Sequence, residues 1–126
     1  MNGKAAIVTG ETPKLERERI VDDFRGGKIK VVCNAQVFTL GFDYPELETV
    51  IVARPTMNLA LWYQMIGRGI RIHPQKEFCQ VVDMCGNLGL FGKVEDLTIV
   101  DGKNGKWHIA SKGRQLTNVY YGERAA

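Results

Sequence analysis

Short apolar runs alternate with longer segments of mixed polarity along the first two thirds of the chain. Four of the runs are typical of strands buried in a sheet, and they lie at residues 5–9, 29–33, 49–53 and 78–82. Helical spacing of apolar residues marks two of the segments between them. Because strands that are apolar on both faces alternate with helices, the pattern predicts an α/β fold with an open parallel sheet and helices on both faces.

The first predicted helix has recognisable start and stop signals. Thr12 is expected as its N-cap, with Pro13 at the first helical position, where the missing amide hydrogen costs no hydrogen bond. Ile20 and Phe24 then share one face at helical spacing. The glycine pair at residues 26–27 predicts the end of this helix.

The second predicted helix covers residues 58–66, with Leu59, Leu61 and Met65 facing inward. The neighbouring aromatic residues Trp62 and Tyr63 could stack on nucleic-acid bases, but packing of the helix against the sheet is the simpler interpretation.

The alternation of apolar runs and helical segments ends after Gly92, which predicts a boundary between a domain at residues 1–92 and an extension at residues 93–126. Residues 97–100 and 106–110 flank a turn-like DGKNG sequence and predict a small β-hairpin. Beyond Ser111 the chain is polar, so we expect a tail. The lysines of the hairpin are typical either of a solvated surface or of a nucleic-acid-binding strip.

Composition and charge narrow the class of protein. The chain has 126 residues, about one domain, and its net charge of 17 − 14 = +3 is too small to establish a nucleic-acid partner. Cys33, Cys79 and Cys85 form an odd set without a C-x-x-C pair, which favours a reducing, cytoplasmic location over a disulfide framework. Cys33 and Cys79 are expected in the core.

Metal and membrane functions have no support in the sequence. His73 and His108 have no cysteine or glutamate at metal-ligand spacing, so we expect no metal site. No apolar run reaches the ~18–20 residues that span a bilayer, and residues 1–10 do not resemble a signal peptide, so we expect no membrane partner.

Residues 40–45 (LGFDYP) form the first segment with candidate chemistry. A glycine between apolar residues, followed by aspartate and proline, fits a tight turn that directs the Asp43 carboxylate out of the carboxyl edge of the sheet, where ligands bind in open α/β folds. Taken alone, the segment also fits an Asx-type turn without a ligand.

Residues 64–71 (QMIGRGIR) form the second. Arg68 and Arg71 lie either on one helical face or around a helix end, and two fork-shaped guanidinium groups can clamp phosphate oxygens. Gly67 and Gly69 would allow the backbone to approach a ligand or a neighbouring domain closely. The alternative is a solvated basic helix end that interacts with the helix dipole.

In this order and separation, the two segments resemble motifs V and VI of superfamily 2 helicases of the DEAD/DEAH-box type, including bacterial and phage DNA helicases. The second matches the Q-x-x-G-R-x-x-R pattern of motif VI, and the resemblance extends over residues 5–92. It implies the C-terminal RecA-like lobe, a P-loop-NTPase-type fold. The strand and helix that carry motif IV in relatives have no counterpart before residue 5.

The resemblance also implies which residues contact the nucleotide. Arg68 and Arg71 would reach the γ-phosphate, one of them as an arginine finger, which makes them the expected catalytic residues. The expected ATP-binding residues are Gly41, Asp43, Gln64 and Gly67.

Nucleic-acid contacts are implied near the first strand and helix, at Gly10, Thr12 and Arg17. Many relatives have a threonine at the position of Ala35 whose hydroxyl contacts a phosphate. Asn34, Gln36 or Thr39 could supply that contact here. The partner would be DNA or RNA.

The chain contains neither G-x-x-x-x-G-K-[ST] nor a D-E-x-[DH] tetrad, so it lacks a phosphate-cradling loop and the carboxylates that hold Mg²⁺. ATP and Mg²⁺ would therefore be bound mainly by an N-terminal RecA-like lobe of the same parent chain, and this chain alone is expected to be inactive. Two alternatives are a degenerate helicase-like module that binds nucleic acid or protein without turnover, and a small Rossmann-like domain that binds a phosphorylated metabolite. The absence of G-x-G-x-x-G disfavours the second.

Overall fold

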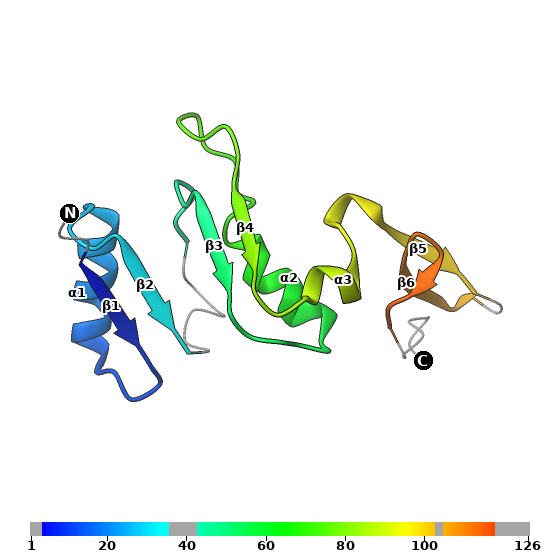
Figure 1. The fold of residues 1–126 in the computed structure, drawn as a ribbon, viewed down its shortest axis with the longest axis horizontal. Coiled ribbons are helices and arrows are strands. Elements are labelled where there is room, and N and C mark those ends of the chain that lie inside the picture. The colour runs from blue at the N-terminus through cyan, green and yellow to red at the C-terminus, as the bar shows by residue number, and fades with distance from the viewer. Residues whose placement is uncertain (1–3, 36–42, 103–104, 118–126) are drawn as a thin grey trace.

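The computed structural model describes residues 4–35, 43–102 and 105–117. Two strand–helix–strand units and a small antiparallel sheet follow one another along the long axis of the molecule (Figure 1). The positions of the expected motifs follow from this order.

The first unit comprises β1 (Ala5–Val8), α1 (Lys14–Arg25) and β2 (Val31–Asn34). The two strands pair in parallel, with Val8 opposite Asn34 at the carboxyl ends. Of its side chains, those of Val8 and Ile20 are buried, so few apolar contacts hold α1 to its strands.

The second unit comprises β3 (Thr49–Val52), α2 (Leu59–Gly67) and β4 (Gln80–Asp83), again with parallel strands. The Asn58 side chain caps α2 by accepting a hydrogen bond from the Leu61 amide at 3.1 Å. Trp62 is 2% exposed and its ring stacks on Phe91, with centroids 6.1 Å apart. Among the described residues, a hydrophobic cluster is centred on this unit and also includes Phe91 from the segment after β4: Val52, Leu59, Trp62, Ile66 and Phe91.

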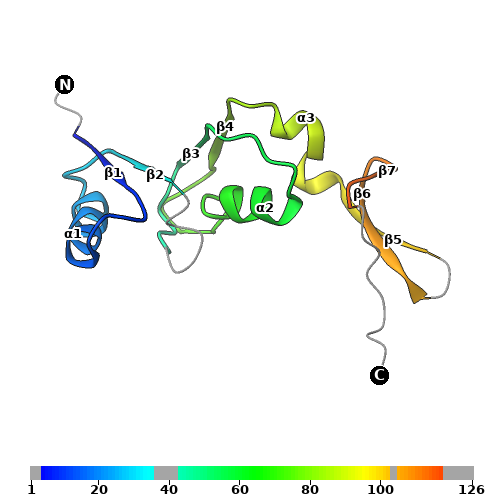
Figure 2. The ribbon, with the colours of Figure 1, turned by 90° about the horizontal axis from the view of Figure 1, so that it is seen from below.

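The alternating order and the parallel pairing agree with the expected α/β class, but the arrangement differs in detail. The described strands form two separate parallel pairs, β1–β2 and β3–β4. Figure 2 shows α1 and α2 on the same side of these strands. On the strands, Ile7 remains 70% exposed and Ile51 58% exposed, so these helices leave apolar positions of the strands uncovered.

Two expectations about the first unit are wrong. Pro13, not Thr12, is the N-cap of α1, because the Thr12 hydroxyl accepts a hydrogen bond from the Thr9 amide at 2.9 Å and closes the turn after β1. Cys33 is exposed instead of buried. It lies opposite the exposed Ile7 in the β1–β2 register, so both belong to the uncovered side of the strands.

A short helix, α3 (Asn87–Phe91), and a 3₁₀ helix, η2 (Val94–Asp96), lead into the C-terminal sheet. The sheet contains β5 (Leu97–Asp101), β6 (Trp107–Ser111) and β7 (Arg114–Gln115), all antiparallel. The expected hairpin is confirmed by the β5–β6 pairing.

The expected polar tail after Ser111 is wrong for residues 112–117. Lys112 and Gly113 both have positive φ and form a tight turn that returns the chain as β7. Leu116 then packs against the hydrophobic cluster. Gly92 is also required for this docking, because a Cβ there would lie 2.3 Å from Oγ of the buried Ser111.

None of the helices in the described part of the chain is long and apolar enough to cross a membrane.

Candidate functional site

An ion pair joins the two sequence motifs. Arg71 Nη1 lies 3.3 Å from Asp43 Oδ2, and the two side chains are 58% and 55% exposed. Helix α1 also reaches this point, because Arg25 Nη2 donates a hydrogen bond to the Asp43 carbonyl oxygen at 2.9 Å. An exposed pair contributes at most ~1 kcal/mol to stability, so its partners can be exchanged for a ligand at little cost.

A cavity of about 230 Å³ lies at this pair. Among the described residues, those that line it come from the two motifs, and they are Asp43, Gln64, Gly67, Arg68 and Arg71. Small-molecule pockets usually enclose roughly 300–1,000 Å³. The cavity is therefore the size of part of a ligand site, and two arginines, one aspartate and one glutamine are among the residues that line it.

The end of α2 decides how the arginines are presented. The helix ends at Gly67, so Arg68 is its C-cap and Arg71 lies beyond it. The arginines therefore spread around a helix end, which was one of the two arrangements left open by the sequence. The partial negative charge of the helix C-terminus stabilises cations at this position.

The two glycines of the second motif have different surroundings. A Cβ at Gly69 would lie 2.1 Å from Cys79 Sγ and 2.9 Å from Val50 Cγ2, whereas a Cβ at Gly67 would meet nothing within 4 Å. The expectation that Gly69 admits a ligand or a second domain is therefore wrong. Its close approach is to a strand of its own unit and to the residue before β4, and it holds the arginine-bearing turn against them.

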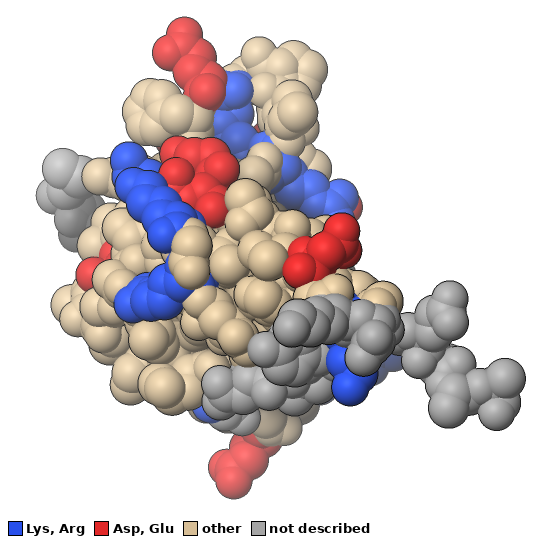
Figure 3. Space-filling model, turned by 90° about the vertical axis from the view of Figure 1, so that its right-hand side faces the viewer, with Lys and Arg blue, Asp and Glu red and all other residues tan. Residues whose placement is uncertain are grey.

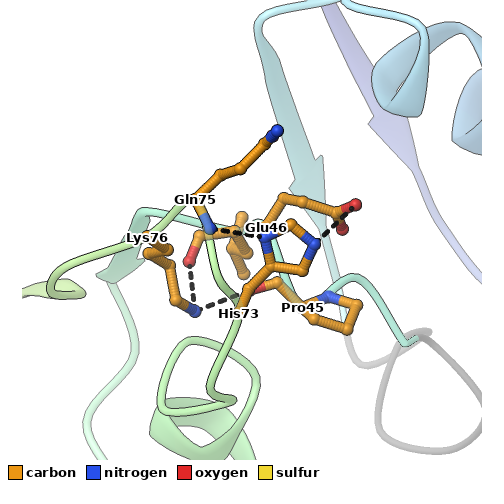
Figure 4. Close-up of polar contacts among 6 residues, drawn as sticks. Pro45, Glu46, His73, Gln75 and Lys76 are labelled. Atoms are coloured by element: carbon orange, nitrogen blue, oxygen red, sulfur yellow. Dashed lines mark hydrogen bonds and ion pairs between the residues drawn. The ribbon is translucent and has the colours of Figure 1, made fainter.

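Sequence reasoning missed Lys76, which connects the two motifs through the backbone. Its Nζ donates hydrogen bonds to the carbonyl oxygens of Pro45 at 2.7 Å, Leu47 at 3.1 Å and Gly69 at 2.8 Å. Figure 4 shows this lysine beside His73, whose Nε2 lies 3.5 Å from Glu46 Oε1. A single lysine after a His-Pro-Gln sequence matches no motif, so the sequence contained no signal for this role.

A second missed cluster lies at the carboxyl end of β4. Asn87 is 2% exposed, and its side chain accepts a hydrogen bond from the Thr56 amide and donates to the Arg54 carbonyl and to Asp83 Oδ1. Burial disfavours the charged form of Asp83. Hydrogen bonds from the Leu88 and Cys85 amides and from Asn87 outweigh that effect, and they hold the pKa of Asp83 below its usual value. This network ties the loop after β3 to the start of α3.

The expected nucleic-acid residues gather at the carboxyl edge of β1 and β2. Arg17 Nη2 donates a hydrogen bond to the Thr12 carbonyl at 3.3 Å, and Gly10 belongs to the same turn. Asn34 lies across the β1–β2 register from Val8, directly before that turn. Gly41 lies outside the described residues.

Basic and acidic side chains are mixed around the described part of the C-terminal sheet. Figure 3 views the molecule from the end that carries the C-terminal sheet, and blue basic groups there are interspersed with red acidic groups. Lys112 Nζ lies 3.4 Å from Asp96 Oδ2. Arg114 donates to the carbonyl oxygens of Gly89 and Leu90, so it serves docking of the sheet on α3.

Metal ligands do not cluster in the described ranges: no group of three or more His, Cys, Asp or Glu residues there is arranged to hold an ion.

Family models and relatives define the class of this protein. Residues 2–73 match the helicase conserved C-terminal domain, which is more than half of the chain. The chain therefore belongs to this family, and the resemblance to the C-terminal lobe of superfamily 2 helicases is confirmed.

Three similar proteins have names or sources that bear on function. The "Putative ATP-dependent helicase IRC3" of Saccharomyces cerevisiae is 39% identical over 79 residues, covering 63% of this chain and 12% of that protein. The "Putative mitochondrial ATP-dependent helicase irc3" of Schizosaccharomyces pombe is 43% identical over 84 residues, covering 67% of this chain and 14% of that protein. The "51.5 kDa protein" of a Lactococcus phage is 42% identical over 73 residues, covering 58% of this chain and 16% of that protein. The chain thus spans less than a fifth of each relative.

Two solved structures confirm the α/β RecA-like fold. The C-terminal domain of the DEAD-box protein Dbp5 matches with a TM-score of 0.54 at 24% identity, covering 67% of this chain and 49% of that one. A Saccharomyces cerevisiae Dbp5 variant bound to RNA and ADP BeF₃ matches with a TM-score of 0.55 at 27% identity, covering 67% and 22%.

Proposed function

We propose that this chain acts as the C-terminal motor lobe of an ATP-dependent helicase or translocase. The observation that carries the proposal is the convergence of two motifs, separated in sequence, on one cavity whose lining residues are Asp43, Gln64, Gly67, Arg68 and Arg71. The ATP-dependent helicases among the similar proteins support it.

In this proposal the arginines act on the γ-phosphate and the aspartate on the ribose. The Asp43 carboxylate accepts hydrogen bonds from ribose hydroxyls, and Gln64 senses the nucleotide from the preceding turn. Arg71 leaves its exposed pair with Asp43 for the phosphate, and this exchange costs little because the pair is worth at most ~1 kcal/mol. Arg68 and Arg71 then stabilise the negative charge that develops during phosphoryl transfer.

The rest of the active site is assigned to an N-terminal RecA-like lobe of the same parent chain. That lobe would cradle the β- and γ-phosphates and provide the carboxylates for Mg²⁺. Gly10, Thr12, Arg17 and Asn34 would contact the backbone of DNA or RNA, since a motor that moves along nucleic acid needs sequence-independent phosphate contacts.

The test uses the parent protein with Arg68→Ala and Arg71→Ala. Each should reduce kcat for ATP hydrolysis by roughly 10³–10⁵, the range for arginine fingers. Nucleotide affinity should change much less, because a finger acts mainly in the transition state.

Arg19→Ala is the matched control, because Arg19 is exposed on α1 and does not line the cavity. Its basal turnover should equal the parental value. Near-parental turnover of the Arg68 and Arg71 variants would reduce the arginine pair to a solvated helix end and remove the main support for the motor assignment.

A further inference from the structure

Lys76 lies between the two chain segments that form the candidate nucleotide site, residues 43–47 and residues 67–71. An ammonium group has three hydrogen-bond donors, and all three have backbone carbonyl partners within 3.1 Å. Two of these carbonyls, at Pro45 and Leu47, follow Asp43 in the chain. The third, at Gly69, lies between Arg68 and Arg71.

Residues 73–75, next to Lys76, are part of a turn that also contacts the segment after Asp43. The Lys76 amide donates to the His73 carbonyl at 3.0 Å and forms a tight turn. Within that turn the Gln75 amide donates to His73 Nδ1 at 3.3 Å, and His73 Nε2 lies 3.5 Å from Glu46 Oε1. The turn thus contacts three consecutive residues, 45–47, of which Figure 4 labels Pro45 and Glu46.

We propose that Lys76 is a positioning residue of the nucleotide site, and this proposal rests on the function proposed above. Lys76 does not line the cavity. Its ammonium fixes the segment after Asp43 against the turn that carries Arg68 and Arg71, and so sets the separation between the ribose-binding and phosphate-binding groups. Misplacement of such groups by about 1 Å can reduce turnover by ~10².

The first test measures ATP hydrolysis by the parent protein with Lys76→Met, which keeps a similar side-chain length and removes the charge and donors. We expect kcat to fall by roughly 10- to 100-fold, in line with misplaced catalytic groups. Lys93→Met is the matched control, because Lys93 is exposed outside the motifs, and it should retain parental kcat.

A double-mutant cycle separates positioning from general damage to the fold. If Lys76 acts through the arginines, Lys76→Met should reduce kcat by a smaller factor in an Arg71→Ala background than in the parent protein, because one of the two arginines it positions is gone. Losses that multiply, or a Lys76→Met variant with parental kcat, would overturn the proposal.

Two further measurements keep the test decisive. If Lys76→Met does not fold, Lys76→Arg replaces it, and its wider planar fork should still lower kcat by about 3- to 10-fold and show the same coupling to Arg71→Ala. No loss with Lys76→Arg would also contradict positioning.

Hydrogen exchange on the parent variants reports on the contacts without turnover. Lys76→Met should accelerate exchange in residues 43–48, where the Leu47 amide donates to the Tyr44 carbonyl at 3.0 Å, while the paired strands β5 and β6 remain unchanged. Unchanged exchange in 43–48 means that this inference fails. Near-parental turnover of Arg71→Ala means that the proposed function fails.

Discussion

The two strand–helix–strand units share an order and a four-residue parallel register, yet they differ in how they are held together. In the first, α1 is rich in charged residues, and Ile20 is its buried residue. In the second, α2 is almost entirely apolar and buries Leu59, Trp62 and Ile66. Four of the five buried cluster residues therefore come from the second unit, with Phe91 added from α3, and the second unit also carries Arg68 and Arg71 at the end of α2.

This difference indicates that the two units contribute to the candidate site in different ways. The second unit is a packed platform that can hold charged side chains at a helix end without relying on them for stability. The first unit contributes polar contacts instead. Arg25 donates to the Asp43 carbonyl, and Phe24 packs edge-on against Tyr44, with ring centroids 5.4 Å apart. Helix α1 is thus tied to the candidate site more closely than to a core of its own.

The largest difference in stability between variants of the two units is expected for a substitution at Trp62. Replacing it with alanine empties the centre of the second unit and should lower the free energy of unfolding by about 3–5 kcal/mol. Leu15→Ala, at a side chain 81% exposed on α1, should change it by less than about 0.5 kcal/mol. Denaturant titration of both variants measures the difference, and equal losses would contradict a core centred on the second unit.

A smaller loss is expected where the arginine-bearing turn packs against its own unit. Gly69→Ala places a methyl group against Cys79 Sγ and Val50 Cγ2 and should cost about 1–3 kcal/mol. Gly67→Ala meets nothing and should be neutral or stabilising, since alanine favours helix over glycine by ~1 kcal/mol. Thermal unfolding compares the pair. Tolerance of Gly69→Ala would mean that the turn is free to move.

The smallest predicted effect is a pH dependence at the end of β4. The folded-state pKa of Asp83 is lowered from 3.8, so its contribution to stability is complete above that pH and is lost as the pH falls through the folded-state pKa. Unfolding measured between pH 2 and pH 6 should show stability decreasing below about pH 4. Asp83→Asn should be less stable at neutral pH, and its profile should be flatter in acid. An unchanged profile would exclude Asp83 as a source of the dependence.

Local sequence patterns were sufficient to predict the strands and helices and the order in which the motifs follow them. Apolar runs and helical spacing predicted β1 to β4, α1 and α2 within a few residues, because both signals depend on neighbouring positions alone. The same applies to the β5–β6 hairpin. Thr12 was misassigned as a cap because its hydroxyl has two possible local partners, and the Thr9 amide was the one it bonded.

The resemblance to the helicase motifs singled out Asp43, Gln64, Gly67, Arg68 and Arg71, together with Gly41 outside the described residues, and the fold brings the first five around one cavity. Only the tertiary structure decided what holds them there. The carbonyl partners of Lys76 lie 7, 29 and 31 residues away in the chain, and every residue has a carbonyl, so no side-chain pattern could mark them. For the same reason, only the packing of the turn against Val50 and Cys79 explains why residue 69 is glycine. Contacts made by the backbone, or by the absence of a side chain, exist only once distant segments have met.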